Sequence, residues 1–344
     1  MKETIEAKLQ SLPRISLANL PTPIYRLSTV SKELGKNIWV KRDDFTGAEM
    51  SGNKVRKLEF AVAEALAQGA DVLITGGGIQ SNHARATAAA AARVGLKSHL
   101  VLEIRKAPKT EGNYLLDQMF GAAITLLDTT KPGSDGENAL SEKMEAVAES
   151  YRQEGLNPYL IPVGASNGIG NLGYLNAFGE ILSQEKALGV RFDAIVCATG
   201  SGGTYSGLYL GNKLFEASRK IAGITVCDDQ RYFTKVCGTI VDETLRLLDE
   251  HLDEEKDFTF IDGYKGLGYA VSKADELAFI AGIAAKEGMI LDPVYTGKAF
   301  YGLYQEVQKG TFDGCENILF IHTGGQYGLF PKQDQMKEVL SSLV

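Results

Sequence analysis

Short apolar runs alternate with longer amphipathic stretches along most of this chain. Short runs rich in Val, Ile and Leu are typical of strands buried on both faces, and apolar positions that recur every three or four residues are typical of helices. The pattern predicts strands at residues 38–40, 72–75, 98–102, 124–127, 159–161, 194–197, 224–226 and 318–322. It predicts helices at residues 56–68, 83–94, 113–119, 138–153, 170–184, 203–217, 242–251, 273–286 and 296–309.

Strands and helices that alternate in this way favour parallel sheets covered by helices on both faces. Two glycine-rich segments, 76–78 and 200–203, each follow a predicted strand and precede a predicted helix, and they lie far apart in the sequence. That separation fits two strand–helix units in different lobes better than one continuous dinucleotide-binding domain. We therefore predict an α/β fold with two open, twisted, mainly parallel sheets, and ligands beyond the carboxyl ends of the strands.

The composition narrows the classes of partner. The chain has 344 residues and a formal net charge of −7, so it lacks the basic excess of a nucleic-acid or anionic-membrane binder. No apolar run has the length of a membrane span, and the charged start MKETIEAKLQ lacks the apolar core of a signal peptide. We therefore expect a cytoplasmic protein with a small-molecule substrate, and neither a nucleic acid nor a membrane as partner.

The cysteines and histidines do not indicate a metal site. The four cysteines lie far apart without a C-x-x-C pair, and they are expected to be buried free thiols in a reducing compartment. The four histidines form no H-E-x-x-H pattern, and zinc sites usually gather several such ligands at short spacing. We expect no metal at these residues, which are Cys197, Cys227, Cys237, Cys315, His83, His99, His251 and His322.

Lys54 lies in the run SGNKVRK, residues 51–57, where a second lysine, Lys57, follows three residues later. The unpaired N–H groups at a helix start already supply positive potential, so cations are disfavoured there. A cluster of three cations at the start of a predicted helix therefore suggests a bound anion or a lysine with a chemical role. Two interpretations stay open for this segment alone, a phosphate clamp and a Schiff-base lysine.

The segment 198–204, with the sequence ATGSGGT, follows a predicted strand and opens a predicted helix. Its glycines let backbone N–H groups converge, and the helix start adds positive potential, so the segment suits a phosphate. The alternative is a tight turn without a ligand, although the glycines are denser than a turn requires. A dinucleotide is not indicated, because Gly200, Gly202 and Gly207 do not have the G-x-G-x-x-G spacing.

The segment 76–83, with the sequence GGGIQSNH, again lies between a predicted strand and a predicted helix. Ser81 or Asn82 can cap that helix, which would explain both residues without any ligand. Together with His83 they also form a donor-rich nest suited to a carboxylate. A phosphate site in one lobe and a carboxylate site in the other describe an enzyme of amino acids with a phosphorylated cofactor.

Two tyrosines and a threonine lie in predicted turns or at a strand end. Tyr269 lies in the run GLGY, and Tyr295 lies in the run DPVYTG. Each is most simply a packing aromatic, but loops carry function disproportionately, so ring stacking or proton transfer is an open alternative. Thr323 follows the predicted strand 318–322 and would point toward a ligand at the carboxyl end of that strand.

Five motifs carry a resemblance to a known family: KRDD at residues 41–44, SGNKVRKLEF at 51–60, GGIQSNH at 77–83, DPVYTGK at 292–298 and FIHTGG at 320–325. The chain resembles the pyridoxal-phosphate enzymes of the tryptophan-synthase-β type (fold type II), in the group that contains D-cysteine desulfhydrase and 1-aminocyclopropane-1-carboxylate deaminase. The resemblance covers nearly the whole chain. It implies pyridoxal 5′-phosphate as cofactor, a homodimer, a large cofactor-binding domain of residues 1–50 and 166–344, and a smaller inserted domain of residues 51–165.

The same resemblance implies a role for each matching residue. Lys54 would hold the cofactor covalently and act as the catalytic base, while Tyr295 would lie against the cofactor ring. Ser81, Tyr269 and Tyr295 would also be catalytic, with Tyr269 near the substrate. The residues implied in cofactor binding are Lys54, Lys57, Asn82, Thr199, Gly200, Ser201, Gly202, Gly203, Thr204, Tyr295 and Thr323. Those implied in substrate binding are Asn53, Ser81, Asn82, His83 and Thr296.

Two positions separate the branches of this group. The resemblance implies that deaminases carry Glu after the DPVY tyrosine and Leu before the final Gly-Gly, whereas this chain has Thr296 and Thr323. A carboxylate at the pyridine nitrogen makes the cofactor a stronger electron sink, which opening a cyclopropane without an α-proton requires. Elimination from cysteine has an acidic α-proton and a good leaving group, so a hydroxyl suffices. The sequence therefore favours β-elimination of D-cysteine to pyruvate, hydrogen sulfide and ammonia.

Other activities stay open at this level. Within the group, 1-aminocyclopropane-1-carboxylate deaminase and L-cysteate sulfo-lyase are the alternatives. A pyridoxal-phosphate carrier without catalytic activity is an alternative of another class. It would need Lys54 and the phosphate segment but not Ser81, Tyr269 and Tyr295, which are all present.

Overall fold

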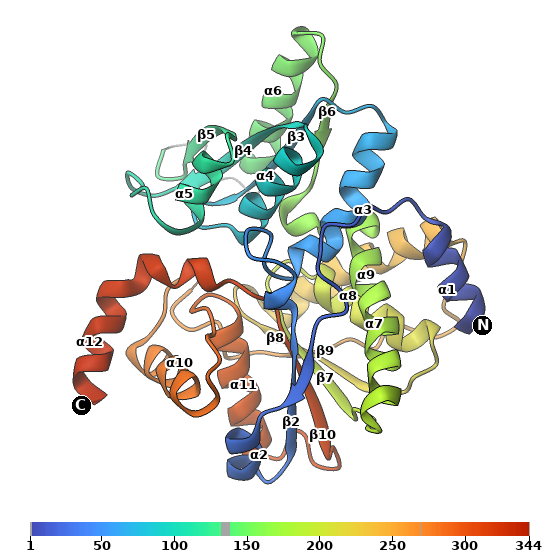
Figure 1. Ribbon diagram of the computed structural model, residues 1–344, viewed down its shortest axis with the longest axis vertical. Helices are drawn as coiled ribbons and strands as arrows, with labels where there is room; N and C mark the ends of the chain where they lie inside the picture. The colour runs from blue at the N-terminus through green and yellow to red at the C-terminus, as the bar shows by residue number, and fades with distance from the viewer. Residues whose placement is uncertain (1, 132–137, 269, 344) are drawn as a thin grey trace.

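The computed structural model describes residues 2–131, 138–268 and 270–343, and its strands form two separate sheets (Figure 1). The larger sheet has six strands, which all run parallel except for the antiparallel edge strand β1. In spatial order these strands are β1 (Ile24–Arg26), β2 (Asn37–Arg42), β10 (Asn317–His322), β7 (Ala194–Thr199), β8 (Lys220–Thr225) and β9 (Thr259–Ile261).

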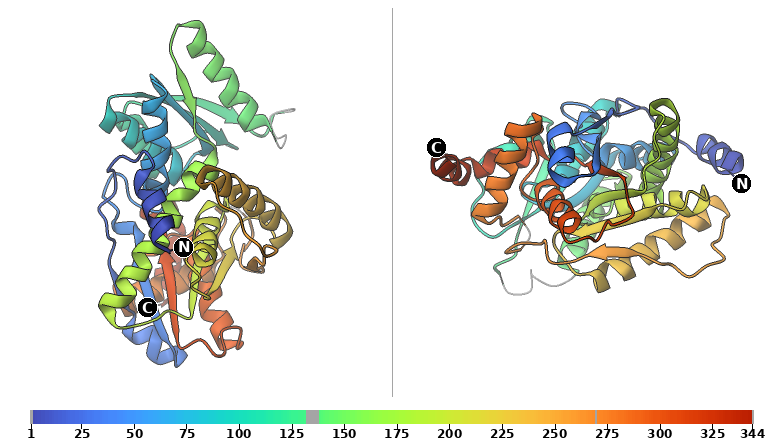
Figure 2. Two further views of the ribbon diagram at one scale, coloured as in Figure 1. Left: turned by 90° about the vertical axis from the view of Figure 1, so that its right-hand side faces the viewer. Right: turned by 90° about the horizontal axis from the view of Figure 1, so that it is seen from below.

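The smaller sheet has four strands, all parallel. Their spatial order is β5 (Ala123–Asp128), β4 (Lys97–Ile104), β3 (Val72–Gly78) and β6 (Pro158–Leu160). The strands of the larger sheet come from both sides of this segment of the sequence. The smaller sheet and its helices stand above the larger sheet in Figure 1 and in the left view of Figure 2. The domain boundaries given above remain a prediction.

Helices surround both sheets. In the described part of the chain the α-helices are α1 (Lys2–Ser11), α2 (Ser28–Leu34), α3 (Lys54–Ala67), α4 (Asn82–Val94), α5 (Gly112–Met119), α6 (Ala139–Gln153), α7 (Gly168–Leu188), α8 (Gly203–Leu214), α9 (Gln230–Leu248), α10 (Ala274–Glu287), α11 (Thr296–Gln308) and α12 (Gln333–Leu343). Short 3-10 turns are η1 (Asp43–Phe45), η2 (Val163–Ala165), η3 (Gln326–Gly328) and η4 (Phe330–Lys332). Among the described helices, none combines the length and the apolar character that a membrane span needs.

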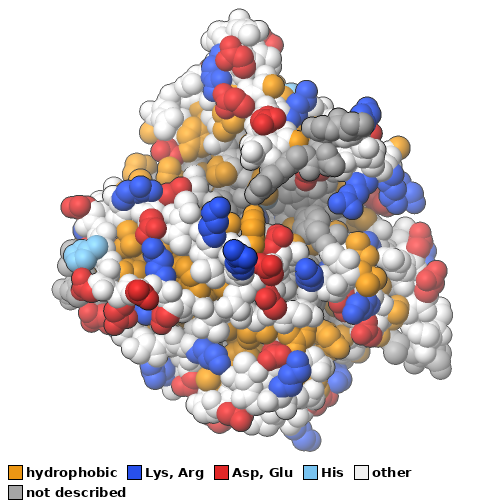
Figure 3. Space-filling view, turned by 180° about the vertical axis from the view of Figure 1, so that it is seen from behind, with side chains coloured by type: hydrophobic (Ala, Val, Ile, Leu, Met, Phe, Trp, Pro, Cys, Tyr) orange, Lys and Arg blue, Asp and Glu red, His pale blue; other side chains and the backbone are white. Residues whose placement is uncertain are grey.

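Both faces of the larger sheet are covered, which explains why its central strands are apolar throughout. On one face α7, α8 and α9 pack a core that includes Phe178 and Phe233. On the other face α2, α10 and α11 pack a second core that includes Ile280 and Phe300. On the surface shown in Figure 3, acidic and basic side chains are interspersed.

The predicted α/β fold with two mainly parallel sheets is confirmed, and each predicted strand and helix overlaps one in the structure. The hydrophobic pattern misses β1 and β9, which have three residues each and are too short to show a period. It also misses α1, α2 and α12. The helix predicted at residues 242–251 begins much earlier, at Gln230, where Asp229 caps it by accepting the N–H of Tyr232.

Arg56, the middle cation of the SGNKVRK run, takes part in a buried ion network. Its guanidinium lies 2.8 Å from Asp43 Oδ1 and 2.9 Å from Glu180 Oε1, and Lys41 Nζ lies 2.6 Å from the same Glu180 oxygen. Arg56 is 1% exposed, so it cannot serve a ligand in solution. One of the three cations at this helix start is therefore structural, and it ties α3 to η1 and α7.

Candidate active site

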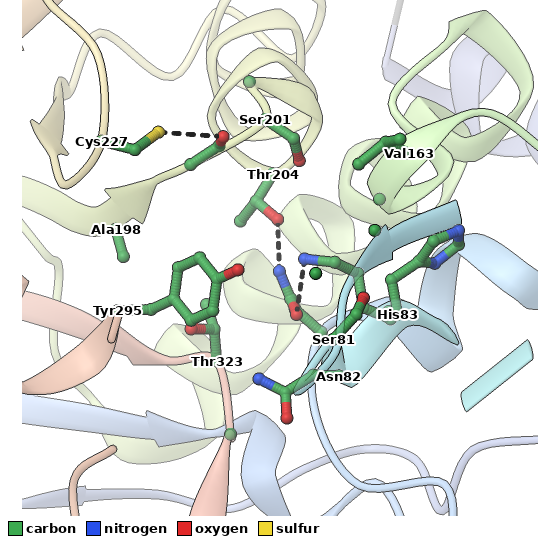
Figure 4. A pocket seen from close by; sticks show the side chains of 18 of the residues that line it. Ser81, Asn82, His83, Val163, Ala198, Ser201, Thr204, Cys227, Tyr295 and Thr323 are labelled. Carbon is green, nitrogen blue, oxygen red and sulfur yellow. Dashed lines mark hydrogen bonds between the residues drawn. The ribbon is translucent and has the colours of Figure 1, made fainter. Parts of the chain in front are cut away.

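A cavity of about 340 Å³ lies between the two sheets, at the carboxyl ends of their strands (Figure 4). The smaller sheet contributes the end of β3 and the start of α4, and the larger sheet contributes the segments after β7, β8 and β10. The predicted site residues that line the cavity are Asn53, Lys54, Ser81, Asn82, His83, Gly200, Ser201, Gly202, Thr204, Tyr295 and Thr323. The predicted residues that do not line it are Lys57, Thr199, Gly203 and Thr296. Tyr269 lies outside the described residues.

Lys54 is the first residue of α3 and projects into the cavity. Its Nζ lies 3.4 Å from Asn53 Oδ1 and 5.9 Å from the centre of the Tyr295 ring. Burial lowers the pKa of Lys54 to about 8, although the negative charge of Asp292 opposes this shift. A lysine with this pKa is partly neutral near physiological pH, so its amine is available as a nucleophile or a base.

The segment after β7 forms a glycine-rich helix start that suits an anion. Gly202 has a φ of 82°, a left-handed conformation that glycine adopts without strain, and α8 begins at the next residue. The Ser201 hydroxyl accepts a hydrogen bond of 2.8 Å from Ser166, which fixes the loop. Asn53 Nδ2 donates to Thr204 Oγ1 over 2.9 Å, so the lysine segment and α8 are joined directly.

Lys57 lies behind this helix start. Its Nζ donates to the Gly164 carbonyl over 3.2 Å, and a Cβ added at Gly203 would lie only 2.7 Å from it. Within the described residues no carboxylate forms an ion pair with Lys57. Burial lowers the pKa of Lys57 well below the usual value, and the charge of Lys54 adds to this shift. A phosphate at the start of α8 would supply the missing negative charge, so the residues present fit a phosphorylated cofactor.

Thr199 faces away from the cavity. Its hydroxyl lies where a Cβ added at Gly223 of β8 would approach to 2.4 Å, and the residue is 1% exposed. The Thr199 hydroxyl therefore faces β8 rather than the cavity, and the contact of Thr199 with phosphate remains a prediction.

On the side of the smaller sheet, Ser81 caps α4. Its Oγ accepts the N–H of Ala84 over 3.1 Å while the residue also lines the cavity, so capping and ligand contact are compatible. His83 Nε2 lies 2.9 Å from Thr75 Oγ1, and burial lowers the pKa of His83 well below the usual value. His83 is therefore neutral at physiological pH and offers hydrogen bonds rather than a charge.

In the DPVYTG loop, Tyr295 lines the cavity but Thr296 does not. A Cβ added at Gly200 would lie 2.9 Å from the Tyr295 ring, so the ring lies against the phosphate segment. Thr296 is fully buried, and its hydroxyl donates to Asp292 Oδ1 over 2.7 Å. The Thr296 hydroxyl thus stabilises its own loop, and contact of Thr296 with the substrate remains a prediction. Thr323 does line the cavity.

Sequence reasoning missed several residues of the site. Glu103 near the end of β4, and Cys227 and Asp228 after β8, line the cavity. The rule that ligands lie beyond the carboxyl ends of parallel strands was the signal that could have found them. Ser166 and Asp292 do not line the cavity, but they hold Ser201 and Thr296 by hydrogen bonds. Asp292 opens the DPVYTGK motif, whereas no sequence pattern indicated Ser166.

The fold and the cavity fit an α/β enzyme with a phosphorylated cofactor, because a glycine-rich helix start and a buried lysine both line the cavity. The chain belongs to the pyridoxal-phosphate dependent enzyme family, whose model matches residues 15–324. The cofactor prediction of pyridoxal 5′-phosphate is confirmed by this membership.

Known relatives carry two activities in their names. The bifunctional D-cysteine desulfhydrase/1-aminocyclopropane-1-carboxylate deaminase of Arabidopsis thaliana mitochondria is 44% identical, over 97% of this chain and 84% of that protein. The D-cysteine desulfhydrase of Serratia proteamaculans is 38% identical, over 96% of this chain and 99% of that protein. A crystal structure described as an ACC deaminase homologue is 40% identical with a TM-score of 0.90, covering 98% of this chain and 100% of the other.

Proposed function

We propose that this protein converts D-cysteine and water to pyruvate, hydrogen sulfide and ammonia. The observation that carries the proposal is the placement of Lys54, an amine with a pKa of about 8, in a cavity lined by Ser81, Asn82 and the start of α8. One side of this cavity suits a phosphate and the other offers donors for a carboxylate. A cavity of about 340 Å³ limits the ligand to the cofactor and a small amino acid.

The residues of the chain have distinct tasks in this reaction. Bound pyridoxal phosphate would supply the electron sink for the substrate's Cα. Lys54 in its neutral form accepts the proton of Cα at Nζ, and the C–S bond then breaks with the electron pair leaving on sulfur. Ser81 and His83 orient the substrate carboxylate, and Tyr295 lies where it can pack against the cofactor ring.

Thr323 is the residue that we propose as favouring elimination over cyclopropane opening. It lines the cavity, whereas Thr296 is bonded to Asp292 behind it. A Thr296→Glu change would place a second carboxylate beside the buried Asp292, so it would test stability more than specificity. Thr323→Leu is therefore the sharper variant, with Thr323→Ser as control. We expect Thr323→Leu to lower the ratio of D-cysteine to cyclopropane activity, and Thr323→Ser to leave it near the wild-type ratio.

A second candidate is 1-aminocyclopropane-1-carboxylate deaminase, which releases 2-oxobutanoate and ammonia from the cyclopropane amino acid. The observation that favours it is the pair of relatives above that carry this activity in their names, each at least 40% identical over nearly the whole chain. The two reactions share the lysine and the cofactor, so the geometry of Lys54 supports both. L-cysteate remains a third substrate to test.

One assay separates these functions. Sulfide, pyruvate, 2-oxobutanoate and ammonia are measured side by side with D-cysteine, L-cysteine, L-cysteate and 1-aminocyclopropane-1-carboxylate as substrates. We expect the highest kcat/KM with D-cysteine, and no activity in Lys54→Ala. A preference for the cyclopropane substrate in the wild-type protein would refute the proposal.

Two further expectations belong to this proposal. We expect this protein to be a homodimer, and light scattering of the purified protein would test this oligomeric state. The cytoplasmic location is likewise a prediction, and fractionation of the source cells would test it.

A further inference from the structure

Two buried polar residues behind the cavity form a chain of hydrogen bonds that ends on Asn82. Arg85 in α4 and Asn113 in α5 are both 0% exposed. Arg85 Nε donates to Asn113 Oδ1 over 2.9 Å. Asn113 Nδ2 donates to Asn82 Oδ1 and to the Gln80 carbonyl, each over 2.9 Å. Neither Arg85 nor Asn113 lines the cavity, so a direct role in binding does not explain them.

The chemistry of the donors fixes which way the side-chain amides of Asn113 and Asn82 are oriented. An arginine only donates, so the Asn113 atom that faces Arg85 must be the oxygen. The other end of the Asn113 amide is then an N–H₂ group, and the Asn82 atom that it faces must be an acceptor. The N–H₂ group of Asn82 is therefore left to face the cavity, as Figure 4 shows.

Arg85 also holds the segment that precedes Lys54. Its Nη2 donates to the Ser51 carbonyl over 2.9 Å, and its Nη1 donates to the Glu49 carbonyl. The same guanidinium therefore connects the orientation of Asn82, on the smaller sheet, with the loop that leads into Lys54. Arginine suits this position because its planar fork can serve three acceptors at fixed angles.

We propose that Arg85 and Asn113 are positioning residues, which hold the Asn82 amide so that it donates to an oxygen on the ring of the bound cofactor. The inference rests on the proposed function for its cofactor site but not for the choice of substrate. Without the chain of hydrogen bonds, the Asn82 amide can turn its oxygen toward the cavity, where it would repel an anionic oxygen instead of binding it.

Asn113→Asp tests this proposal because it reverses the direction of the hydrogen bond between residue 113 and Asn82. Aspartate still accepts from Arg85, but its second oxygen now needs a donor, so Asn82 must turn its N–H₂ group away from the cavity. We expect the affinity of the apoenzyme for pyridoxal 5′-phosphate to fall by about ten- to a hundredfold, the size of one hydrogen bond to a charged group. The affinity is measured by titrating apoenzyme and following the visible absorbance of the bound cofactor.

A double-mutant cycle with Asn82→Ala separates positioning from general damage. If Asn113 acts through Asn82, Asn113→Asp should change the affinity less than about twofold in the Asn82→Ala protein. Asn37→Asp is a matched control, because Asn37 also accepts from an arginine Nε, that of Arg26 at 2.8 Å, but lies on β2 away from the cavity. We expect wild-type cofactor affinity in this control.

Two results would overturn the proposal. One is wild-type cofactor affinity in folded Asn113→Asp, and the other is an equal loss with and without Asn82. Thermal melts of the apoenzymes show whether each variant folds, and Asn113→Ser, which releases the Asn82 amide without adding a charge, enters the same cycle if Asn113→Asp does not fold. The titration needs no turnover, so failure of the substrate assay would remove the proposed function and leave this inference standing.

Discussion

Lys54 and Lys57 lie three residues apart on α3, yet their surroundings give them different tasks. Lys54 reaches the cavity, where burial lowers its pKa to about 8 although the negative charge of Asp292 raises it. Lys57 is buried next to the start of α8 with a carbonyl and a hydroxyl as partners, and burial lowers its pKa well below the usual value. The first amine can exchange protons near neutral pH, whereas the second gains a counter-charge only when an anion arrives.

The first prediction concerns the pH dependence of the reaction. Because Lys54 must be a free, neutral amine to accept a proton while the substrate is bound, kcat should rise with pH and level off above a midpoint near 8. Initial rates between pH 6 and 9 measure this. Lys54→Arg, which keeps the charge but cannot lose its proton in this range, should be inactive throughout. A flat profile in the wild-type protein would contradict the assignment of Lys54 as the base.

The second prediction concerns Asp117, a fully buried carboxyl group in α5 whose oxygens have no hydrogen-bond partner. Burial raises its pKa to about 8, although Arg85 opposes the shift. An exposed aspartate in the unfolded chain loses its proton near pH ~4. Between these two values the folded state binds more protons than the unfolded state, so the free energy of unfolding contributed by this group falls as the pH rises.

Asp117→Asn removes the cost of this buried charge. We expect the variant to be more stable than the wild type by about 1–3 kcal/mol at pH 8, with a smaller difference at pH 5. Urea unfolding at both pH values measures this. Glu255→Gln, at an exposed position, is the control and should have little effect at either pH. A gain that is independent of pH would show that titration of Asp117 is not the cause.

At the scale of elements, the start of α8 depends on the absence of a side chain at Gly203. A Cβ there would lie 2.7 Å from Lys57 Nζ and 2.9 Å from Ser166 Oγ. Gly203→Ala should therefore displace the end of the Lys57 side chain and weaken cofactor binding by roughly tenfold. Cofactor titration of the apoenzyme measures this.

Gly238→Ala is the matched control for that change. Gly238 also lies in a helix, α9, but a Cβ added there meets nothing within 4 Å. This variant should keep wild-type cofactor affinity and gain about 0.5–1 kcal/mol in stability, because alanine favours the helix. Equal cofactor affinity in the two alanine variants would refute the steric argument for Gly203.

The sequence predicts the elements of this fold well where they are long and periodic, and less well where tertiary packing decides. The strands 194–197 and 318–322 are continuous apolar runs, and both form central strands of the larger sheet. In α9 the polar residues and Gly238 weaken the helical pattern of the first half, so only the second half is predicted. That first half is helical because Phe233 and Cys237 pack into the core, which no local pattern shows.

The candidate site follows the same division. Lys54 and the glycines after β7 were predictable, because a helix start and its glycines have local signatures. The position of Thr296 was not, because its hydroxyl could face either the cavity or Asp292, and a hydrogen bond of 2.7 Å decides for Asp292. The structural role of Arg56 could not be predicted from the sequence either, because its partners Asp43 and Glu180 lie in other parts of the chain.

At the scale of the whole molecule, the ion network around Arg56 connects β2, η1, α3 and α7. Removing one partner of a buried ion pair leaves the other charges uncompensated, which costs about 3–5 kcal/mol. We therefore expect Arg56→Met to lose stability by about that amount in urea unfolding. Arg152→Met is the control, because Arg152 pairs with Glu145 and Glu149 on the exposed surface of α6, and it should change stability by less than ~1 kcal/mol. Similar losses in both variants would contradict a special role for the network.

The pairing of β2 with β10 has a consequence for the newly made protein. Asn37 of β2 pairs in register with Asn317 of β10, and the Asn53 N–H reaches the Thr323 carbonyl over 3.1 Å. Contacts between such distant parts of a chain form only after the intervening loop closes, and during synthesis the amino-terminal part emerges first. The smaller sheet has all its strands within one segment and can form before the ribosome reaches β10. A nascent chain that ends before Thr323 therefore carries the reactive lysine without one wall of the pocket that must enclose it.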